Sequence, residues 1–231
     1  MSGPRVKTMP RFTDDPRRSA EALYVDQNPE SRVSSSILAF VRARAGRRII
    51  DFGCGTGGYA ALLRQSGFDV TAVDQNPVYV AATASLGVPA ERVNGALPFP
   101  DRAFDTLMMI EVLEHVSDDD VEAVLADIRR VVRRNVLITV PDCEDVSALQ
   151  RAGVTHEHFL AADHVQFFTK PRLQALLDRF FPAVEITRGD PILPHLLLPP
   201  IVRRPLSGLY RLGILRPSLY SRLFAEARVD V

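Results

Sequence analysis

The glycine-rich stretch from Arg48 to Ala60, which reads RIIDFGCGTGGYA, holds the residues best suited to bind a nucleotide-like ligand. Its apolar first half predicts a buried strand that ends near Asp51, and its last residues predict the start of a helix. Gly53, Gly55 and Gly57 allow a tight turn and let a ligand approach the backbone closely. A turn of this kind, between a strand and a helix N-terminus, predicts a nucleotide-type binding site.

A second apolar stretch, Val70 to Asp74, ends in an acidic residue. Asp74 lies 21 residues after Gly53, close to the offset of about 20 residues at which a carboxylate meets ribose hydroxyls. A carboxylate accepts hydrogen bonds from a vicinal diol and repels a 2′-phosphate. The sequence therefore predicts a ligand with an unphosphorylated ribose.

Carboxylates and imidazoles gather in two later stretches, residues 111–115 and residues 155–170. The first holds Glu111, Glu114 and His115, and the second, THEHFLAADHVQFFTK, holds His156, His158 and His164. Four of the five histidines of the chain therefore lie in these two stretches. An imidazole titrates near neutral pH, so a histidine here can accept a proton from a hydroxyl or an amine.

Alternating strands and helices must position these residues. Apolar runs predict strands at 48–52, 69–74, 91–94, 103–111, 135–140 and 183–187, and helical spacing predicts helices at 29–45, 59–66, 77–86, 118–130 and 171–180. Such alternation implies a parallel sheet whose ligands bind at the C-terminal ends of the strands. That rule places five residues around one cleft: Gly53, Asp74, Asn94, Glu111 and Asp142.

The chain resembles the class I S-adenosylmethionine (SAM) dependent methyltransferases. The resemblance covers about residues 47–186 and is carried by DFGCGTG (51–57), VD (73–74), LPFPDRAFD (97–105) and IEVLEHV (110–116). It implies an α/β, Rossmann-like, doubly wound fold with a mainly parallel seven-stranded sheet and helices on both faces. The seventh strand cannot be located in the sequence. The cofactor-binding residues that the resemblance implies are Asp51, Gly53, Gly55, Gly57, Asp74, Gln75, Asn94, Gly95 and Glu111.

Three roles stay open for the histidine-rich residues. In the first, His115, His164 and Glu111 form the catalytic group, and a histidine takes the proton of the acceptor. In the second, the EVLEH…DHVQFFT pairing is similar to metal-dependent small-RNA 2′-O-methyltransferases, which implies that Mg²⁺ or Mn²⁺ binds to Glu111, Glu114, His115 and His164. In the third, Glu114 and His115 only order their loop through hydrogen bonds to the backbone.

Composition excludes some classes of function. The chain has 231 residues and a net charge of zero, from 28 basic and 28 acidic side chains, so it carries no signal of nucleic-acid binding by bulk charge. Cys54 and Cys143 have no metal-ligand spacing and indicate a reducing compartment. No signal peptide and no apolar run of about 18 residues is visible. We therefore expect a cytoplasmic protein.

The chain divides into three predicted parts: an N-terminal arm (1–28), a SAM-binding domain (29–189) and a basic, Pro/Leu-rich C-terminal extension (190–231). Between Ile201 and Ala225 the extension carries five arginines and no acidic residue. Such a segment indicates membrane association through peripheral contact, or binding of a lipid-linked substrate. A helical lid and a dimer surface are equal alternatives, and the sequence does not predict the oligomeric state.

The predicted function is methyl transfer from SAM to a small or lipid-linked acceptor, at a hydroxyl oxygen, in a sugar, cell-envelope or secondary-metabolite substrate. One alternative is a metal-dependent RNA 2′-O-methyltransferase. Another is a non-catalytic SAM-binding or scaffold protein, and a dinucleotide-dependent oxidoreductase is a minor fourth.

Overall fold

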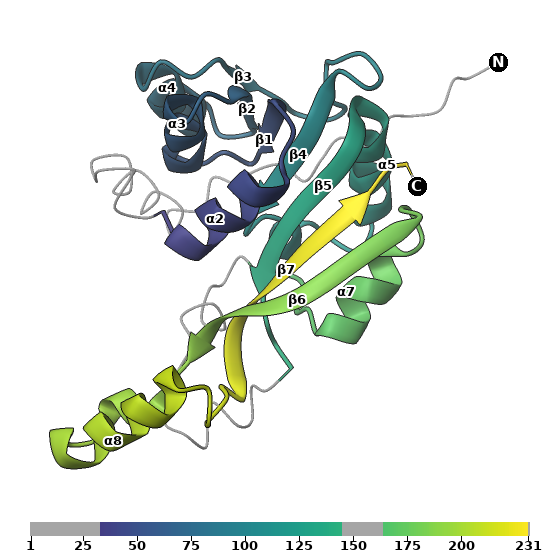
Figure 1. The fold of residues 1–231 in the computed structure, drawn as a ribbon. Helices are drawn as coiled ribbons and strands as arrows, with labels where there is room; N and C mark the ends of the chain where they lie inside the picture. Colours follow the sequence, from purple (N-terminus) through teal and green to yellow (C-terminus); the bar gives the residue numbers. More distant parts are fainter. Residues whose placement is uncertain (1–32, 145–163, 231) are drawn as a thin grey trace.

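A seven-stranded sheet with the strand order β3-β2-β1-β4-β5-β7-β6 forms the centre of the computed structural model, which describes residues 33–144 and 164–230 (Figure 1). The strands are β1 (Arg48–Phe52), β2 (Asp69–Asp74), β3 (Ala90–Arg92), β4 (Phe104–Ile110), β5 (Val132–Pro141), β6 (Ala183–Ile192) and β7 (Leu219–Arg228). The helices are α2 (Ser35–Arg44), α3 (Gly58–Gln65), α4 (Pro77–Ser85), α5 (Val121–Val131), α7 (Lys170–Leu177) and α8 (Pro200–Arg211), with the short turns η3 (Leu113–His115) and η5 (Pro194–Leu197).

The first five strands are parallel, and helices cover both faces of the sheet. β4 is buried along almost its whole length, as its nearly continuous apolar sequence predicts for a central parallel strand. One apolar cluster joins α5 and α7 to the sheet, with Leu125 and Leu173 among its members. A second cluster joins α2 and α3 to the sheet, with Val41 and Leu63 among its members. The predicted fold class is confirmed.

The seventh strand, β7, lies between β5 and β6 and runs antiparallel to both. It comes from the part of the chain that the sequence analysis assigned to the C-terminal extension. The division at residue 189 therefore does not match the sheet: β6 continues to Ile192, and β7 returns residues 219–228 to the core. Three apolar residues of β7 spaced two apart are buried there: Leu223, Ala225 and Ala227. This spacing is typical of a strand and is visible in the sequence.

The segment between β6 and β7 stands at one edge of the sheet. β6 and β5 both run antiparallel to β7, with Ile192 paired to Leu219 and Pro141 paired to Arg222. The end of β6 and the start of β7 therefore lie at the C-terminal edge of the parallel strands. η5 and α8 project from that edge, at the lower left of Figure 1.

Some sequence predictions fall outside the described residues: the N-terminal arm at 1–28, His156 and His158. Among the residues that the structure does describe, no helix has the length and apolar character needed to cross a membrane.

Candidate active site

The glycine-rich turn joins β1 to α3 at the C-terminal edge of the sheet. The amide of Gly53 donates to the Val73 carbonyl at 2.9 Å, which ties the turn to β2. Gly57 has φ 81°, and a Cβ there would lie 2.6 Å from Thr83 Oγ1. At Gly55, with φ 52°, a Cβ would meet no described atom within 4 Å. Packing therefore fixes one side of the turn, and open space lies beside Gly55.

Asp74 ends β2 next to this turn. Its Oδ2 accepts a hydrogen bond from the Gly55 amide at 3.0 Å, and its Oδ1 accepts one from the Asn76 amide at 2.8 Å. Burial raises the pKa of the carboxyl, and the amides partly offset that effect. A carboxylate has about four acceptor positions, and the amides of Gly55, Gln75 and Asn76 act on this one, so Asp74 keeps a position that can accept from a ribose hydroxyl.

Asp51 is buried in β1 behind the turn, with 3% of its surface exposed. Burial, and then the negative charge of Asp74, raise the pKa of Asp51 to about 8. A cation bound nearby would favour the ionised form of this carboxyl. The ends of β1 and β2 together therefore form an acidic site that suits a ligand with positive charge.

The segment after β3 lies alongside Asp74. The amide of Val93 donates to the Asp74 carbonyl at 3.0 Å, which holds the two segments together. Asn94 is exposed, and Gly95 is buried with φ 124°. The structure thus brings Gln75, Asn94 and Gly95 to the edge of the sheet that carries Asp74.

Glu111 follows β4 and has φ 54°, in the left-handed region that non-glycine residues seldom adopt. Its Oε1 accepts hydrogen bonds from Thr139 Oγ1 at 2.8 Å and from Arg222 Nε at 3.0 Å. Arg222 also forms an ion pair with Asp190, which has φ 53°. One arginine on β7 therefore holds two carboxylates whose backbones are both strained.

This contact was not predicted from the sequence, which counted Arg222 among the five arginines of a basic surface segment. The structure places its guanidinium inside the site because β7 enters the sheet. Only 15% of the Arg222 side chain is exposed. The apolar residues Leu223, Ala225 and Ala227 are spaced two apart, which is typical of a strand. A strand predicted there would have placed Arg222 in the sheet.

Glu114 and His115, which belong to η3, come together with His164. Each offers one potential ligand atom, and these atoms lie within 4.8 Å of one another. The rings of His115 and His164 meet edge to face, with centroids 4.8 Å apart. The Glu114 carbonyl accepts hydrogen bonds from the amides of Val165 and Gln166, at 2.9 and 3.0 Å, and this holds His164 over η3. Of the four residues predicted as metal ligands, Glu111 is not in this group.

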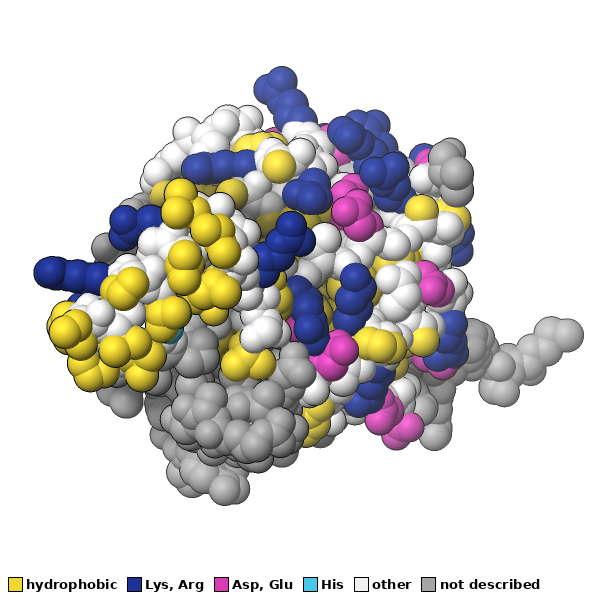
Figure 2. Space-filling model, turned by 60° about the horizontal axis from the view of Figure 1, so that its bottom comes forward, with side chains coloured by type: hydrophobic (Ala, Val, Ile, Leu, Met, Phe, Trp, Pro, Cys, Tyr) yellow, Lys and Arg dark blue, Asp and Glu magenta, His cyan; other side chains and the backbone are white. Residues whose placement is uncertain are grey.

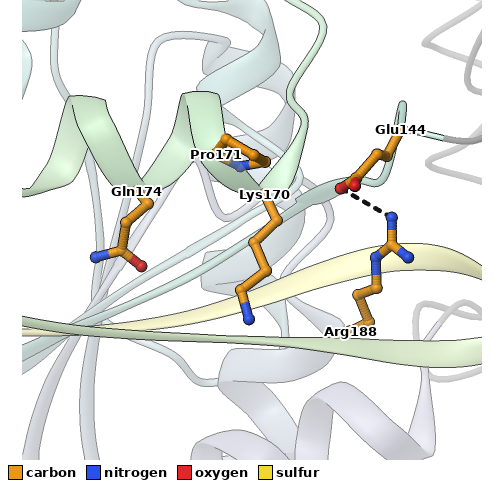
Figure 3. A pocket seen from close by; sticks show the side chains of 5 residues that line it. All are labelled: Glu144, Lys170, Pro171, Gln174 and Arg188. Atoms are coloured by element: carbon orange, nitrogen blue, oxygen red, sulfur yellow. Dashed lines mark ion pairs between the residues drawn. The ribbon is translucent and has the colours of Figure 1, made fainter.

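A pocket of about 360 Å³ lies between α7, β6 and the residues after β5 (Figure 3). Its lining is Glu144, Lys170, Pro171, Gln174 and Arg188. Arg188 Nη2 forms an ion pair with Glu144 at 2.8 Å, drawn as a dashed line in Figure 3. None of the residues predicted to bind the cofactor or to act in catalysis lines this pocket, so we do not assign the chemistry to it.

Known proteins resemble the chain in both sequence and fold. Residues 25–180 match the family model for a methyltransferase domain. The chain is 31% identical over 94 residues to a demethylmenaquinone methyltransferase of Tropheryma whipplei, covering 38% of each protein. It is 32% identical over 103 residues to a ubiquinone biosynthesis O-methyltransferase of Proteus mirabilis, covering 39% of the chain and 42% of the relative. The chain thus spans about two fifths of the length of these relatives.

Solved structures share the fold at lower sequence identity. A SAM-dependent methyltransferase of Thermotoga maritima superposes with a TM-score of 0.64 at 16% identity, covering 93% of the chain and 97% of that protein. The magnesium protoporphyrin IX methyltransferase of Synechocystis, solved with bound S-adenosylhomocysteine, has a TM-score of 0.60 at 14% identity, covering 92% and 95%. Because the family model matches more than half of the chain, the protein belongs to the SAM-dependent methyltransferase-domain family.

Proposed function

We propose that this protein transfers a methyl group from SAM to a hydroxyl oxygen of a small acceptor. The observation that carries the proposal is the Asp74 carboxylate, which the Gly55 amide holds beside the open side of the glycine turn and which keeps an acceptor position for a ribose hydroxyl. One relative is named a demethylmenaquinone methyltransferase and the other a ubiquinone biosynthesis O-methyltransferase, and the second name supports a hydroxyl oxygen of a quinone-type ring as the acceptor. We therefore assign the acceptor to the quinol-like, lipid-soluble class.

The glycine turn and its neighbours form the cofactor site in this proposal. SAM, when bound, supplies a methyl group that its sulfonium charge activates. Asp74 binds the ribose hydroxyls, and the ionised form of Asp51 favours the positive charge of the ligand. The remaining members of the site are Gly53, Gly55, Gly57, Gln75, Asn94, Gly95 and Glu111.

The acceptor proton goes to an imidazole. His115 and His164 lie in contact beside η3, and either can take a proton from a hydroxyl as the new bond forms. Glu111 is oriented by Thr139 and Arg222 at the end of β4, and its carboxylate holds the reacting groups in place. We propose these three residues as the catalytic group.

Calorimetric titration with S-adenosylhomocysteine tests the cofactor site. We expect Asp74→Ala to weaken binding about 10- to 100-fold, since a hydrogen bond to a charged group contributes about 1.5–3 kcal/mol. Asp69→Ala is the matched control, because Asp69 is exposed at the other end of the same strand. Equal affinities for the two variants would contradict the ribose assignment. Binding without turnover on hydroquinone acceptors would contradict methyl transfer and favour a scaffold role.

A second candidate is that a divalent cation assists the acceptor. The observation behind it is the grouping of one carboxylate and two imidazoles at Glu114, His115 and His164. This mixed oxygen and nitrogen set suits Mn²⁺ better than a thiolate-binding metal. In this role the three residues would hold the ion, and the ion would acidify the acceptor hydroxyl.

Titration of metal-stripped protein with MnCl₂ separates the two roles of the histidines. If the cation binds, Glu114→Gln and His164→Ala abolish the binding heat. Glu111→Gln, which alters a carboxylate outside the group, leaves it intact. The absence of any heat, together with turnover that survives EDTA, would reject the metal and leave the general base.

A further inference from the structure

Exposed apolar side chains concentrate on the segment between β6 and β7. Of the ten large hydrophobic side chains that are most exposed among the described residues, six lie between residues 196 and 214. Ile201 is 84% exposed, Leu212 is 75% exposed and Ile214 is 65% exposed. The other three are Leu196, Leu198 and Val202. This clustering, unlike scattered single residues, marks a binding surface.

The same segment carries only positive charge. No acidic residue occurs from Pro191 to Ala225. Arg203, Arg204, Arg211 and Arg216 are exposed, and no ion pair joins any of the four to a described acidic residue. In Figure 2 the apolar side chains gather at the left of the molecule, with basic side chains around them and the acidic side chains on other parts of the face.

Helix α8 separates these two kinds of residue onto opposite sides. At 100° per residue, Arg203, Arg204 and Arg211 share one side, whereas Ile201, Val202, Leu206 and Leu209 share the other. The segregated apolar and arginine-rich sides are typical of a helix that lies in a membrane interface.

Contacts with η5 fix the rotation of α8. The buried His195 ring stacks on Tyr210 with centroids 4.5 Å apart, and its Nε2 lies 3.1 Å from Ser207 Oγ. Ser207 and Tyr210 belong to the side of α8 that carries the arginines. The apolar side of the helix therefore points away from η5, where Ile201 and Val202 are exposed.

The position of α8 relates this surface to the candidate active site. Ile192 and Leu219, which flank the segment, are paired at the C-terminal edge of the sheet. Asp74 ends β2, and Gly53 and Glu111 directly follow β1 and β4, whose ends lie at the same edge. A membrane that meets α8 would thus lie on the side of the protein that carries the candidate active site.

We propose that α8 and its flanking residues, from Leu196 to Ile214, dock on an anionic lipid bilayer. The apolar side chains enter the interface, and Arg203, Arg204, Arg211 and Arg216 contact the phosphate groups of the lipids. Docking holds the candidate active site near the bilayer, where a lipid-soluble acceptor is concentrated. That consequence rests on the proposed function, whereas the docking itself does not.

Vesicle co-sedimentation of the full chain tests the proposal. The protein should sediment with vesicles of phosphatidylcholine and phosphatidylglycerol, and added NaCl should release it. Arg203→Gln/Arg204→Gln should weaken this binding about 25-fold, the loss expected for two basic side chains near an anionic surface. Ile201→Ser/Leu212→Ser should weaken binding to the same vesicles at all salt concentrations.

Arg47→Gln/Arg134→Gln is the matched control, since it removes the same charge at the opposite edge of the sheet and should bind as the parent does. Failure to sediment, equal binding of the two arginine variants, or equal binding to pure phosphatidylcholine would overturn the proposal. Concentration-dependent dimerisation that Ile201→Ser/Leu212→Ser abolishes, without vesicle binding, would assign the surface to a second copy instead. Titration of each variant with S-adenosylhomocysteine shows separately whether the cofactor proposal holds.

Discussion

Two carboxylates at the edge of the sheet, Asp51 and Glu111, have different charged neighbours. Asp51 is buried against Asp74, and its pKa is raised to about 8. Glu111 instead meets the guanidinium of Arg222, which it shares with Asp190. A carboxylate that faces another carboxylate favours a cationic ligand, whereas one bound by arginine is fixed in position. The two settings therefore differ: Asp51 keeps its proton near neutral pH and releases it when a cation binds nearby, whereas Glu111 is held in a fixed orientation by Arg222.

Asp51→Asn should remove a pH dependence of stability. In the unfolded chain Asp51 loses its proton near its ordinary pKa of 3.8, and in the folded protein near 8. Between these values the folded state holds one more proton, so the free energy of unfolding falls by up to about 1.4 kcal/mol per pH unit as the pH rises. Urea unfolding at pH values of about 5 and about 8 should show this loss in the parent and a smaller loss in Asp51→Asn. Parallel changes in both proteins would show that Asp51 is ionised in the folded state.

Arg222→Gln should destabilise the protein by about 3 kcal/mol, because it leaves two partly buried carboxylates without their cation. The control is Arg228→Gln on the same strand, where the arginine is 61% exposed and its contact with Glu226 is 3.6 Å long. That change should cost less than about 0.5 kcal/mol. The comparison is made by urea unfolding, and equal losses would show that the Arg222 ion pairs contribute nothing beyond strand packing.

The residues of the proposed cofactor site could be grouped from the sequence because they are local. Gly53, Gly55 and Asp74 lie in short stretches whose spacing reflects a strand, a turn and the next strand. The partnership of Glu111 with Arg222 could not be predicted, since 111 positions separate them and only strand order brings them together. Spacing rules describe neighbours along the chain and do not report which distant strands pair.

At the scale of elements, the turn between β1 and α3 contains two glycines with positive φ whose surroundings differ. Both Gly55 and Gly57 have positive φ, but only at Gly57 would a Cβ collide with a neighbour, Thr83 on α4. The contact joins the start of α3 to α4. The turn therefore positions two helices relative to each other, in addition to its proposed role in binding the cofactor.

Gly57→Ala should destabilise the protein more than Gly55→Ala. The backbone conformation costs about 1 kcal/mol for alanine at either position, and the collision with Thr83 should add about 2 kcal/mol at residue 57. Thermal unfolding measures the difference. Gly55→Ala should remain folded and yet bind S-adenosylhomocysteine more weakly, because its Cβ fills the open space. Equal stabilities would mean that α4 shifts to accommodate the methyl group.

Element boundaries deviate from the sequence prediction where side chains contact charged partners. The fifth strand was predicted to begin at Asn135 but begins at Val132, directly after α5. The sequence did not predict this start, because the charged residues Arg133 and Arg134 interrupt the apolar run and are typical of a loop. In the structure Arg133 forms an ion pair with the buried Asp105. Asp105 is distant in the sequence, so the hydrophobic pattern around Arg133 could not predict this contact.

At the scale of the whole molecule, the fold separates a sheet from an attached surface segment. β6 and β7 are paired up to Ile192 and Leu219, so the hairpin is complete without residues 193–218. η5 and α8 project from it as an insertion (Figure 1). The candidate active site and the proposed membrane-docking surface therefore occupy parts of the chain that can be separated.

Replacement of residues 193–218 by Asn-Gly should leave the folded sheet intact, since a two-residue turn joins paired antiparallel strands directly. We expect circular dichroism and S-adenosylhomocysteine affinity close to those of the parent, with loss of vesicle binding. Truncation after residue 218 is the contrasting variant. It removes β7 from between two strands and should prevent folding. Loss of folding in the Asn-Gly variant would show that α8 supports the core.

The placement of β7 also has a consequence for synthesis. β7 leaves the ribosome after β6, yet it lies between β5 and β6 in the finished sheet. The parallel strands β1 to β5 can pair as they emerge, whereas β6 must wait for the strand that follows it. Until residues 219–228 appear, the backbone groups along the outer side of β5 lack their partner strand. The nascent protein is thus most exposed to pairing with other chains during the interval in which η5 and α8 are being translated.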